Sequence, residues 1–244
     1  MLEYQLSIIV PVYNEPYALQ SFKCWWNKLS NKDALDLRIC IARGSQHDEC
    51  VRIAESFSHV IKHFQPSRGV QMNTGAEYAK AEILFFLHVD SCPPANFVKI
   101  ITNVLCQDGV IAGAFSHRFT ESPRSRSLKV ISVLNRIRYH ISGNYYGDQG
   151  LFIKREDFNA IGAFPECPVL EDVYMVRKLR ELGKVVCVPE IMTTSGRRFL
   201  ANGPWRTFFR MWGILCMDFF AWISNEVQFG MNRKVTKPGG FSNY

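Results

Sequence analysis

The chain has 244 residues, of which 47% are hydrophobic, and this is enough to fill one core of the larger α/β kind. It carries no internal repeat and no low-complexity stretch, which argues against a solenoid or a disordered protein. The net charge of +7 is concentrated in two stretches: six Lys or Arg against one Glu in residues 115–141, and seven against two acidic residues in 196–244. Such stretches favour phosphates, a membrane surface or nucleic acid as partners, although solvated helix faces have the same composition.

The first 110 residues alternate between short apolar runs and amphipathic stretches. The apolar runs predict strands buried on both faces, at residues 6–13, 37–42, 60–64 and 82–89. The stretches between them predict helices, at residues 17–29, 47–57, 67–81 and 93–105. Ser67 is a candidate N-cap, and the last of these helices opens on proline, where a missing N–H costs least. Alternation at this rhythm predicts a parallel sheet covered by helices.

The pattern loosens after residue 110. Residues 109–119 alternate between apolar and polar, and residues 150–156 form only a short apolar segment. Residues 171–184 predict an amphipathic helix that ends at Gly183 as its C′ residue. The eight cysteines are scattered without a CxxC pair, which predicts reduced thiols and a cytoplasmic location. The opening "MLEYQLSIIVPVYNE" lacks the basic start of a signal peptide, so we expect none here.

His88 and Asp90 follow the predicted strand at residues 82–89, where ligands bind in open α/β sheets. Two apart on an extended chain, they would point to the same side and could share a divalent cation that holds a diphosphate. A turn cap with a hydrogen-bonded histidine is the plainer alternative. Cys92 also raises a zinc site, but no second Cys/His cluster lies nearby to complete four ligands.

Several segments, taken in order, resemble the family-two glycosyltransferases, and most closely the small bacterial selenodomain-associated transferase-two branch. They are "SIIVPVYNE", "SRGVQMNTGAEYAKAEILFFLHVDSCPP", "YYGDQGLFIKREDFNAIGAFPECPVLEDVYMVRKLRELGK" and "SGRRF". The resemblance covers about residues 6–227. It implies a three-layer αβα nucleotide-diphospho-sugar transferase (GT-A) fold with a mostly parallel central sheet and a C-terminal helical tail. We expect one domain over residues 1–244, with a nucleotide-binding half at 1–110, an acceptor half at 111–200 and the tail at 201–230.

The resemblance implies an enzyme that moves a sugar from a nucleoside-diphosphate donor to a hydroxyl acceptor, with inversion and with Mn²⁺ or Mg²⁺. Asp172 matches the general base, with Glu171 beside it, and the helix dipole at this helix start would keep the carboxylate ionised. Asp90 and His88 match the metal-binding motif, and a nitrogen ligand would favour Mn²⁺. The remaining matches fall in two groups: nucleotide-binding Pro11, Asn14, Glu15, Arg68, Asn73 and Gly75, and acceptor- or diphosphate-side Asp148, Gln149, Arg197 and Arg198.

Plainer structural roles stay open for several of these residues. Glu171 and Asp172 could merely cap their helix, and Arg68 could be a solvated first-turn residue. Asp148 could belong to a Gly-Asp turn, and Arg197 with Arg198 could be a surface pair.

The chain departs from the family where the second strand usually ends in an aspartate that reads the nucleotide base. Anchored on Gly44 and Ser45, that position falls on Ala42, with Arg43 next. Phe199 likewise stands where the late motif usually has tryptophan. A UDP-sugar remains the expected donor by family default, and Asp48 is a candidate substitute for reading the base.

Three other functions are alternatives to sugar transfer. A sugar nucleotidyltransferase needs a glycine-rich phosphate loop after the first strand, and "PVYNEPYAL" has no glycine. A non-catalytic nucleotide-binding relative is favoured by Ala42. A nucleic-acid binder would rest on the basic stretches, which lack the interleaved glycines and aromatics of RNA modules, so no nucleic-acid partner is expected.

The tail predicts contact with a membrane surface or with the core. Its apolar run from Met211 stops at Asp218, short of the ~20 residues that a span needs. Arg206 and Arg210 share a helix face, and aromatic residues such as Trp205 and Trp222 suit the headgroup boundary. Many relatives act on lipid-linked or membrane-proximal acceptors, so we expect a peripheral position at the inner face of the membrane, with core packing as the alternative.

Overall fold

The protein is described by a computed structural model that covers residues 4–63, 65–143, 145, 147–167 and 169–235. For His63, Phe219 and residues 221–235 only the backbone is described. The chain divides into two compact units, Met1–Ser195 and Gly196–Tyr244. The division into a nucleotide-binding half, an acceptor half and a tail within one domain stays a prediction.

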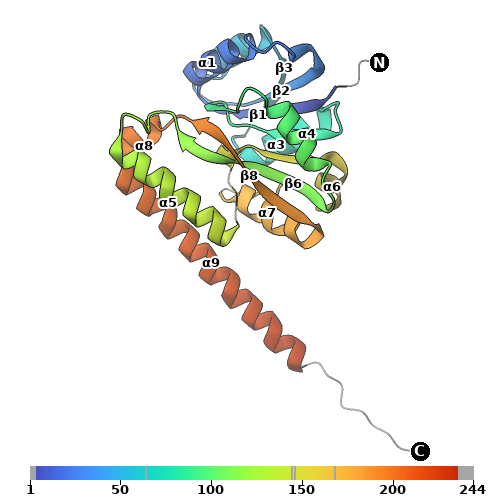
Figure 1. Ribbon diagram of the computed structural model, residues 1–244, viewed down its shortest axis with the longest axis vertical. Helices are drawn as coiled ribbons and strands as arrows, with labels where there is room; N and C mark the ends of the chain where they lie inside the picture. Colours follow the sequence, from blue (N-terminus) through green and yellow to red (C-terminus); the bar gives the residue numbers. More distant parts are fainter. Residues whose placement is uncertain (1–3, 64, 144, 146, 168, 236–244) are drawn as a thin grey trace, which may run out of the picture. The chain divides into compact units, whose positions relative to one another are not determined.

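The first unit is built on one eight-stranded sheet in the order β3-β2-β1-β4-β7-β6-β8-β5 (Figure 1). The four strands β1 to β4 run parallel, β7 is antiparallel to both of its neighbours, and β6 runs parallel to β8. The strand bounds are Leu6–Val12 (β1), Leu35–Ala42 (β2), His59–His63 (β3), Ile83–Phe86 (β4), Ser91–Cys92 (β5), Val110–Phe119 (β6), Leu151–Lys154 (β7) and Lys184–Thr194 (β8).

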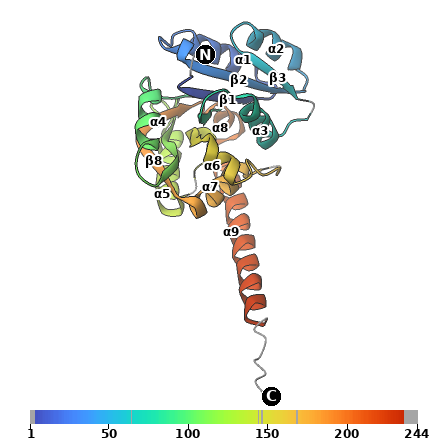
Figure 2. The same ribbon diagram turned by 90° about the vertical axis from the view of Figure 1, so that its right-hand side faces the viewer.

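Helices cover both faces of this sheet (Figures 1 and 2). Buried residues of α1, α2 and α4 pack on one face, and those of α3, α6 and α7 pack on the other with Tyr139 of α5. The predicted three-layer αβα arrangement is therefore confirmed. The helix bounds are Pro16–Trp26 (α1), His47–Glu55 (α2), Arg68–Tyr78 (α3), Phe97–Leu105 (α4), Arg126–Ser142 (α5), Arg155–Ala160 (α6) and Glu171–Leu182 (α7), with short 3₁₀ turns at Lys32–Ala34 (η1) and Gly147–Gln149 (η2).

The second unit consists of α8 (Arg197–Asn202) and the long helix α9 (Pro204–Val235). The helical tail predicted for residues 201–230 is thus present. Among the helices of the described residues, none has the length and apolar character needed to cross a membrane.

The elements differ from the sequence-based prediction at several ends. The strand predicted to reach Val89 ends at Phe86, because the chain turns before the histidine. Gly183 is not a left-handed C′ glycine, since its φ of −178° is extended backbone that leads directly into β8. Ser67 does occupy the N-cap position of α3, but its side chain makes no capping hydrogen bond. Two long elements, α5 and β8, were not predicted.

The topology brings the carboxyl ends of β1, β2, β4, β6 and β8 to the same edge of the sheet. Because β7 runs the opposite way, its first residue lies at this edge too. Polar residues that follow these strands therefore converge, and in open α/β sheets this edge is where ligands bind.

Gly75 provides a test of the packing below that edge. It lies where α3 crosses β1, and a Cβ at this position would collide with Ile9 Cγ2 and lie 2.9 Å from Cys40 Sγ. Gly75→Ala should therefore overpack the core and lower the free energy of unfolding by about 1–3 kcal/mol, as measured by denaturant titration. Gly213→Ala in α9 is the control, because nothing lies within 4 Å of its added methyl group. Equal stability of the Gly75→Ala protein and the wild type would show that α3 packs differently.

Candidate active site at the carboxyl edge of the sheet

His88 and Asp90 lie in a turn after β4 and not on the strand itself. The amide of Leu87 still donates to the carbonyl of Ile9 (3.0 Å), and the amide of Ser91 then donates back to the carbonyl of His88 (3.0 Å). We expected both side chains to point to the same side because the chain would be extended here. The chain turns instead, so this reason for the prediction is wrong. Both side chains are nevertheless within electrostatic reach of the same two groups, Asp148 and Arg68.

The surroundings keep the His88 imidazole neutral and make the Asp90 carboxylate unusually basic. Burial lowers the pKa of His88 to about 4, helped by Arg68 and opposed by Asp148. Burial raises the pKa of Asp90 to about 6; its own backbone amide opposes this, and the neighbouring carboxylates Asp148 and Glu121 add to it. Arg68 opposes the rise as well.

This donor set fits a divalent cation that completes its coordination shell with oxygens of a diphosphate. A neutral imidazole and an ionised carboxylate are the protonation states in which these side chains can coordinate a metal. A cation would also relieve the repulsion among the carboxylates around Asp90. The described residues contain no group of three or more His, Cys, Asp or Glu that could hold a metal by protein ligands alone. Within the described residues, Cys92 is exposed and belongs to no such group.

Glu171 and Asp172 begin α7, and the protein holds Asp172 from two directions. Leu170, at the N-cap, has a left-handed backbone (φ 64°) that turns the chain into the helix. Asp172 Oδ1 accepts the amide N–H of Val173 (2.8 Å), and Oδ2 accepts the amide N–H of Gly147 (2.6 Å). Asp172 is only 8% exposed, so its carboxylate is fixed in orientation and largely removed from water.

Burial governs the basicity of Asp172. It raises the pKa of Asp172 to about 6, the charge of Glu171 adds to this, and Arg68 and the two amide hydrogen bonds oppose it. Desolvation therefore outweighs the helix start and raises the pKa, yet with a pKa of about 6 this carboxylate is still mostly ionised at pH 7; that the helix dipole contributes to this stays a prediction. A carboxylate with a pKa near neutrality is a better proton acceptor than an ordinary aspartate.

Arg68 is positioned by Glu171. Its Nε lies 2.6 Å from Glu171 Oε1; the Glu171 side chain is 2% exposed and that of Arg68 is 46% exposed. Arg68 is therefore ion-paired as well as partly exposed, and the plainer alternative of a solvated first-turn arginine stays open. Arg68 links the start of α3 to the start of α7. Contact with a nucleotide stays a prediction.

Gly147 connects the turn after β4 with the start of α7. Its amide donates to Asp172, and on its other side a Cβ would collide with Nε2 of His88 and lie 2.9 Å from Cε1 of that ring. Only a residue without a side chain fits between the two groups. Gly147 was not predicted as a site residue, although its neighbours were and the Gly-Asp pair was a visible signal.

Asp148 and Gln149 complete η2 at the same edge. Asp148 Oδ2 lies 3.4 Å from Nε2 of the buried His117, whose pKa is lowered by burial. The Asp148 carbonyl accepts the hydroxyl of Thr194 (3.1 Å), and this hydroxyl is 2.7 Å from Ser91 Oγ. The buried Gln149 donates to the carbonyl of Phe115 (3.0 Å) and so fastens η2 to β6. His117 and Thr194 were not predicted, because nothing in the sequence relates them to Asp148.

The turn after β1 is fastened to the turn after β2. Asn14 has a left-handed backbone (φ 52°), and its Oδ1 accepts the amide N–H of Gln46 (3.0 Å) in the turn after β2. A Cβ at Gly44 would collide with the Asn14 side chain, so the two turns fit closely. Pro11 is buried within β1, and Glu15 is the N-cap of α1. Their contact with a nucleotide stays a prediction.

The base-reading position of the family holds no polar side chain here. Ala42 is fully buried at the end of β2, and its carbonyl lies 3.2 Å from Nδ1 of His47. Arg43 and Asp48 are exposed on the turn and on the first turn of α2. That Asp48 substitutes for the missing aspartate stays a prediction.

Asn73 and Gly75 have structural contacts. Both polar atoms of the Asn73 amide bind the backbone of Phe164: Nδ2 donates to its carbonyl and Oδ1 accepts its amide, each at 2.9 Å. Gly75 faces the sheet at Ile9. The two residues position α3, and their contact with a nucleotide is untested.

Arg197, Arg198 and Phe199 lie at the start of α8 in the second unit. The expectation that the two arginines meet a diphosphate stays a prediction.

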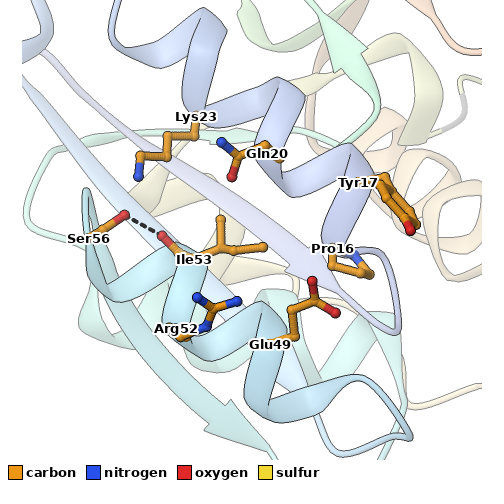
Figure 3. A pocket seen from close by; sticks show the side chains of 8 residues that line it. All are labelled: Pro16, Tyr17, Gln20, Lys23, Glu49, Arg52, Ile53 and Ser56. Carbon is orange, nitrogen blue, oxygen red and sulfur yellow. Dashed lines mark hydrogen bonds between the residues drawn. The ribbon is translucent and has the colours of Figure 1, made fainter.

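A groove of about 470 Å³ lies apart from these residues, between α1 and α2 (Figure 3). Its lining includes Tyr17, Lys23, Glu49 and Arg52, and none of the predicted site residues contributes to it. Polar chemistry gathers at the carboxyl edge of the sheet, so we assign the candidate active site there.

The sequence model of a family described as glycosyl transferase family 2 matches residues 7–164. No curated protein sequence matches the chain. Among solved structures, a mannosyltransferase from Pyrobaculum calidifontis in complex with GDP-Man and Mn²⁺ is similar with a TM-score of 0.64 and 18% identity. The similarity covers 79% of this chain and 57% of that one, so this chain spans little more than half of that relative.

Two further structures show the same fold. Glucosyl-3-phosphoglycerate synthase from Mycobacterium tuberculosis, solved with Mn²⁺, UDP and phosphoglyceric acid, has a TM-score of 0.56 at 17% identity, over 76% of this chain and 68% of that one. TarS 1–349 from S. aureus has a TM-score of 0.57 at 13% identity, over 78% of this chain and 60% of that one. These similarities confirm the predicted GT-A fold.

The charge balance at Asp172 can be tested directly. Arg68→Gln removes the cation that lowers the pKa of Asp172, so this pKa should rise above about 6, as followed by ¹³C NMR of labelled aspartate carboxyl carbons. Glu171→Gln should lower it. Lys62→Gln is the matched control, since Lys62 pairs with Glu55 on the surface at 3.1 Å. If the Arg68→Gln and control proteins give the same Asp172 pKa, Arg68 does not act on this carboxylate.

Proposed function

Because this chain belongs to glycosyl transferase family 2, we propose that it transfers a sugar from a nucleoside-diphosphate donor to a hydroxyl group of an acceptor, with inversion at the anomeric carbon. The observation that carries the proposal is Asp172, a buried and doubly hydrogen-bonded carboxylate with a pKa of about 6. Family membership supports glycosyl transfer in general, and the site residues support the finer assignment.

In this proposal Asp172 is the general base. An acceptor hydroxyl must lose its proton as it attacks the anomeric carbon, and a fixed carboxylate with a pKa near neutrality can take that proton. Each carboxylate oxygen of Asp172 accepts one amide N–H and keeps a second lone pair. Glu171 assists from beside it, since its charge raises the pKa of Asp172 while its own oxygen holds Arg68.

Asp90 and His88 would hold the divalent cation, Mn²⁺ or Mg²⁺. When bound, the cation neutralises the charge that develops on the leaving diphosphate. The neutral imidazole of His88 favours Mn²⁺, because nitrogen ligands suit it better than Mg²⁺. The solved relatives with Mn²⁺ and a nucleotide support a cation of this kind.

The donor would occupy the carboxyl edge between the turns after β1 and β2. Pro11, Asn14 and Glu15 would bind the nucleotide with Arg68, Asn73 and Gly75, and Asp148 and Gln149 would face the sugar and acceptor. Arg197 and Arg198 would meet the diphosphate. A UDP-sugar is the proposed donor by family default, although relatives were solved with GDP-Man as well as UDP. Ala42 favours one alternative, a relative that binds a nucleotide without catalysis.

We also propose a cytoplasmic location with peripheral contact to the inner face of the membrane, and a lipid-linked or membrane-proximal acceptor. All eight cysteines lie within the described residues and are free thiols, as a reducing compartment requires. On α9, Trp205 and Phe209 are 42% and 65% exposed, and Arg206 and Arg210 are exposed beside them. Trp222, also expected at the headgroup boundary, has a side chain outside the described residues.

Asp172→Asn should leave binding of nucleoside diphosphates almost unchanged and reduce turnover by roughly 10²-fold or more, because the amide cannot accept a proton. Turnover is measured as Mn²⁺-dependent hydrolysis of UDP-glucose and GDP-mannose, with water as the acceptor. Asp157→Asn is the control, since Asp157 lies in the first turn of α6, which follows the opposite end of β7. Equal losses of binding and turnover in Asp172→Asn would indicate a structural cap instead of a base.

Asp90→Ala should abolish the gain in nucleoside-diphosphate affinity that Mn²⁺ confers, as measured by titration calorimetry with and without the metal. His88→Asp should keep turnover and shift the metal preference toward Mg²⁺, because an oxygen ligand suits the harder ion. Asp108→Ala, at an exposed position, is the control. Turnover that persists undiminished in excess chelator would refute the metal assignment.

A further inference from the structure

Helix α5, which includes most of the first basic stretch of the sequence, exposes an apolar stripe. Val130, Val133 and Ile137 are 45%, 51% and 50% exposed, and Ile141 is 82% exposed. Their spacing of three and four residues places them along one side of the helix. The buried residues of α5, Leu128, Ile131, Ser132 and Tyr139, occupy the opposite side; Tyr139 belongs to the core of the first unit, and Ser132 Oγ accepts the amide N–H of Phe119 (3.4 Å). The stripe is therefore not the inward face of the helix.

Cations border this stripe. Lys129 and Arg136 are exposed and lie two turns apart along one flank, and Arg126 begins the helix. Residues 122–142 contain five Lys or Arg and no Asp or Glu. A long helix that combines an exposed aliphatic stripe with cations, and that carries no carboxylate, is complementary to a surface that is apolar and anionic at once.

This charge pattern disfavours a second copy of the chain as the partner. Two α5 helices packed antiparallel about Val133 would bring Lys129 of each against Arg136 of the other, and no carboxylate on either helix could offset the repulsion. The helix also cannot cross a bilayer, because its 17 residues extend only about 25 Å and carry charges throughout.

We propose that α5 lies in the plane of an anionic lipid surface, with Val130, Val133, Ile137 and Ile141 at the headgroup boundary and Lys129 and Arg136 on the lipid phosphates. This binding face belongs to the first unit, is distinct from α9, and does not depend on the proposed sugar transfer. Its place along the chain connects it to the site: α5 ends at Ser142, and Gly147, six residues beyond Ile141, donates to Asp172. The segment that contacts the proposed base therefore follows the lipid-binding helix closely along the chain.

The test is sedimentation of the full chain with vesicles of phosphatidylcholine alone or mixed with phosphatidylglycerol, at low and high salt. Wild-type protein should bind only the anionic vesicles, and salt should weaken binding. Lys129→Glu with Arg136→Glu should reduce the partition coefficient roughly tenfold or more. Ile137→Asn with Ile141→Asn should also weaken binding at low salt. This pair should abolish the vesicle binding that the wild-type protein retains at high salt. Both pairs are exposed, so circular dichroism and the melting temperature should stay unchanged.

The matched control is Lys28→Glu with Lys99→Glu, an equal change of charge at exposed positions after α1 and on α4, which cover the other face of the sheet. It should bind like the wild type. Arg206→Glu with Arg210→Glu measures the separate contribution of α9. The proposal is overturned if both α5 variants bind vesicles like the wild type, or if only the α9 variant loses binding. It is also overturned if the Ile137→Asn, Ile141→Asn protein dissociates an oligomer in sedimentation velocity while binding vesicles normally.

Discussion

The candidate site depends on one backbone hydrogen bond, from the amide of Gly147 to Asp172 Oδ2 at 2.6 Å. This bond joins the turn before β7 to the start of α7, and the absence of a side chain on Gly147 lets the same residue lie against the His88 ring. The proposed metal-binding turn and the proposed base are thus separated by a single glycine. A donor bound at His88 and Asp90 would have its sugar within a short distance of Asp172, as an in-line attack requires.

Burial shifts the pKa values of three groups around this bond. It keeps His88 neutral and raises the pKa values of Asp90 and Asp172 to about 6, so these carboxylates are less strongly ionised near neutrality than ordinary aspartates. Arg68 is the cation that acts on all three groups, and Glu171 fixes it at 2.6 Å. A site with several buried carboxylates and one shared arginine is suited to a ligand that brings a divalent cation with it.

The strands of the first half could be predicted, because apolar runs are local properties of the sequence. Motif order singled out Asp90, Asp172 and Arg68, and Arg68 lies within electrostatic reach of both carboxylates, but their roles stay predictions. The contacts of His117 and Thr194 with Asp148 could not be predicted, because they depend on how β6 and β8 align beside η2. Helix α5 was missed because its exposed side is as apolar as its buried side, which removes the usual amphipathic pattern. The raised pKa of Asp172 could not be predicted, because the sequence reveals a helix start and not the burial around it.

The central claim is that a single carboxylate, Asp172, activates the acceptor for direct displacement at the anomeric carbon. Such a displacement inverts the configuration of the sugar, whereas a two-step route through the enzyme retains it. The most direct measurement is the anomeric configuration of the sugar first released from an α-linked nucleotide sugar with water as acceptor, followed by proton NMR before mutarotation. The account predicts the β-anomer, and initial release of the α-anomer would contradict it.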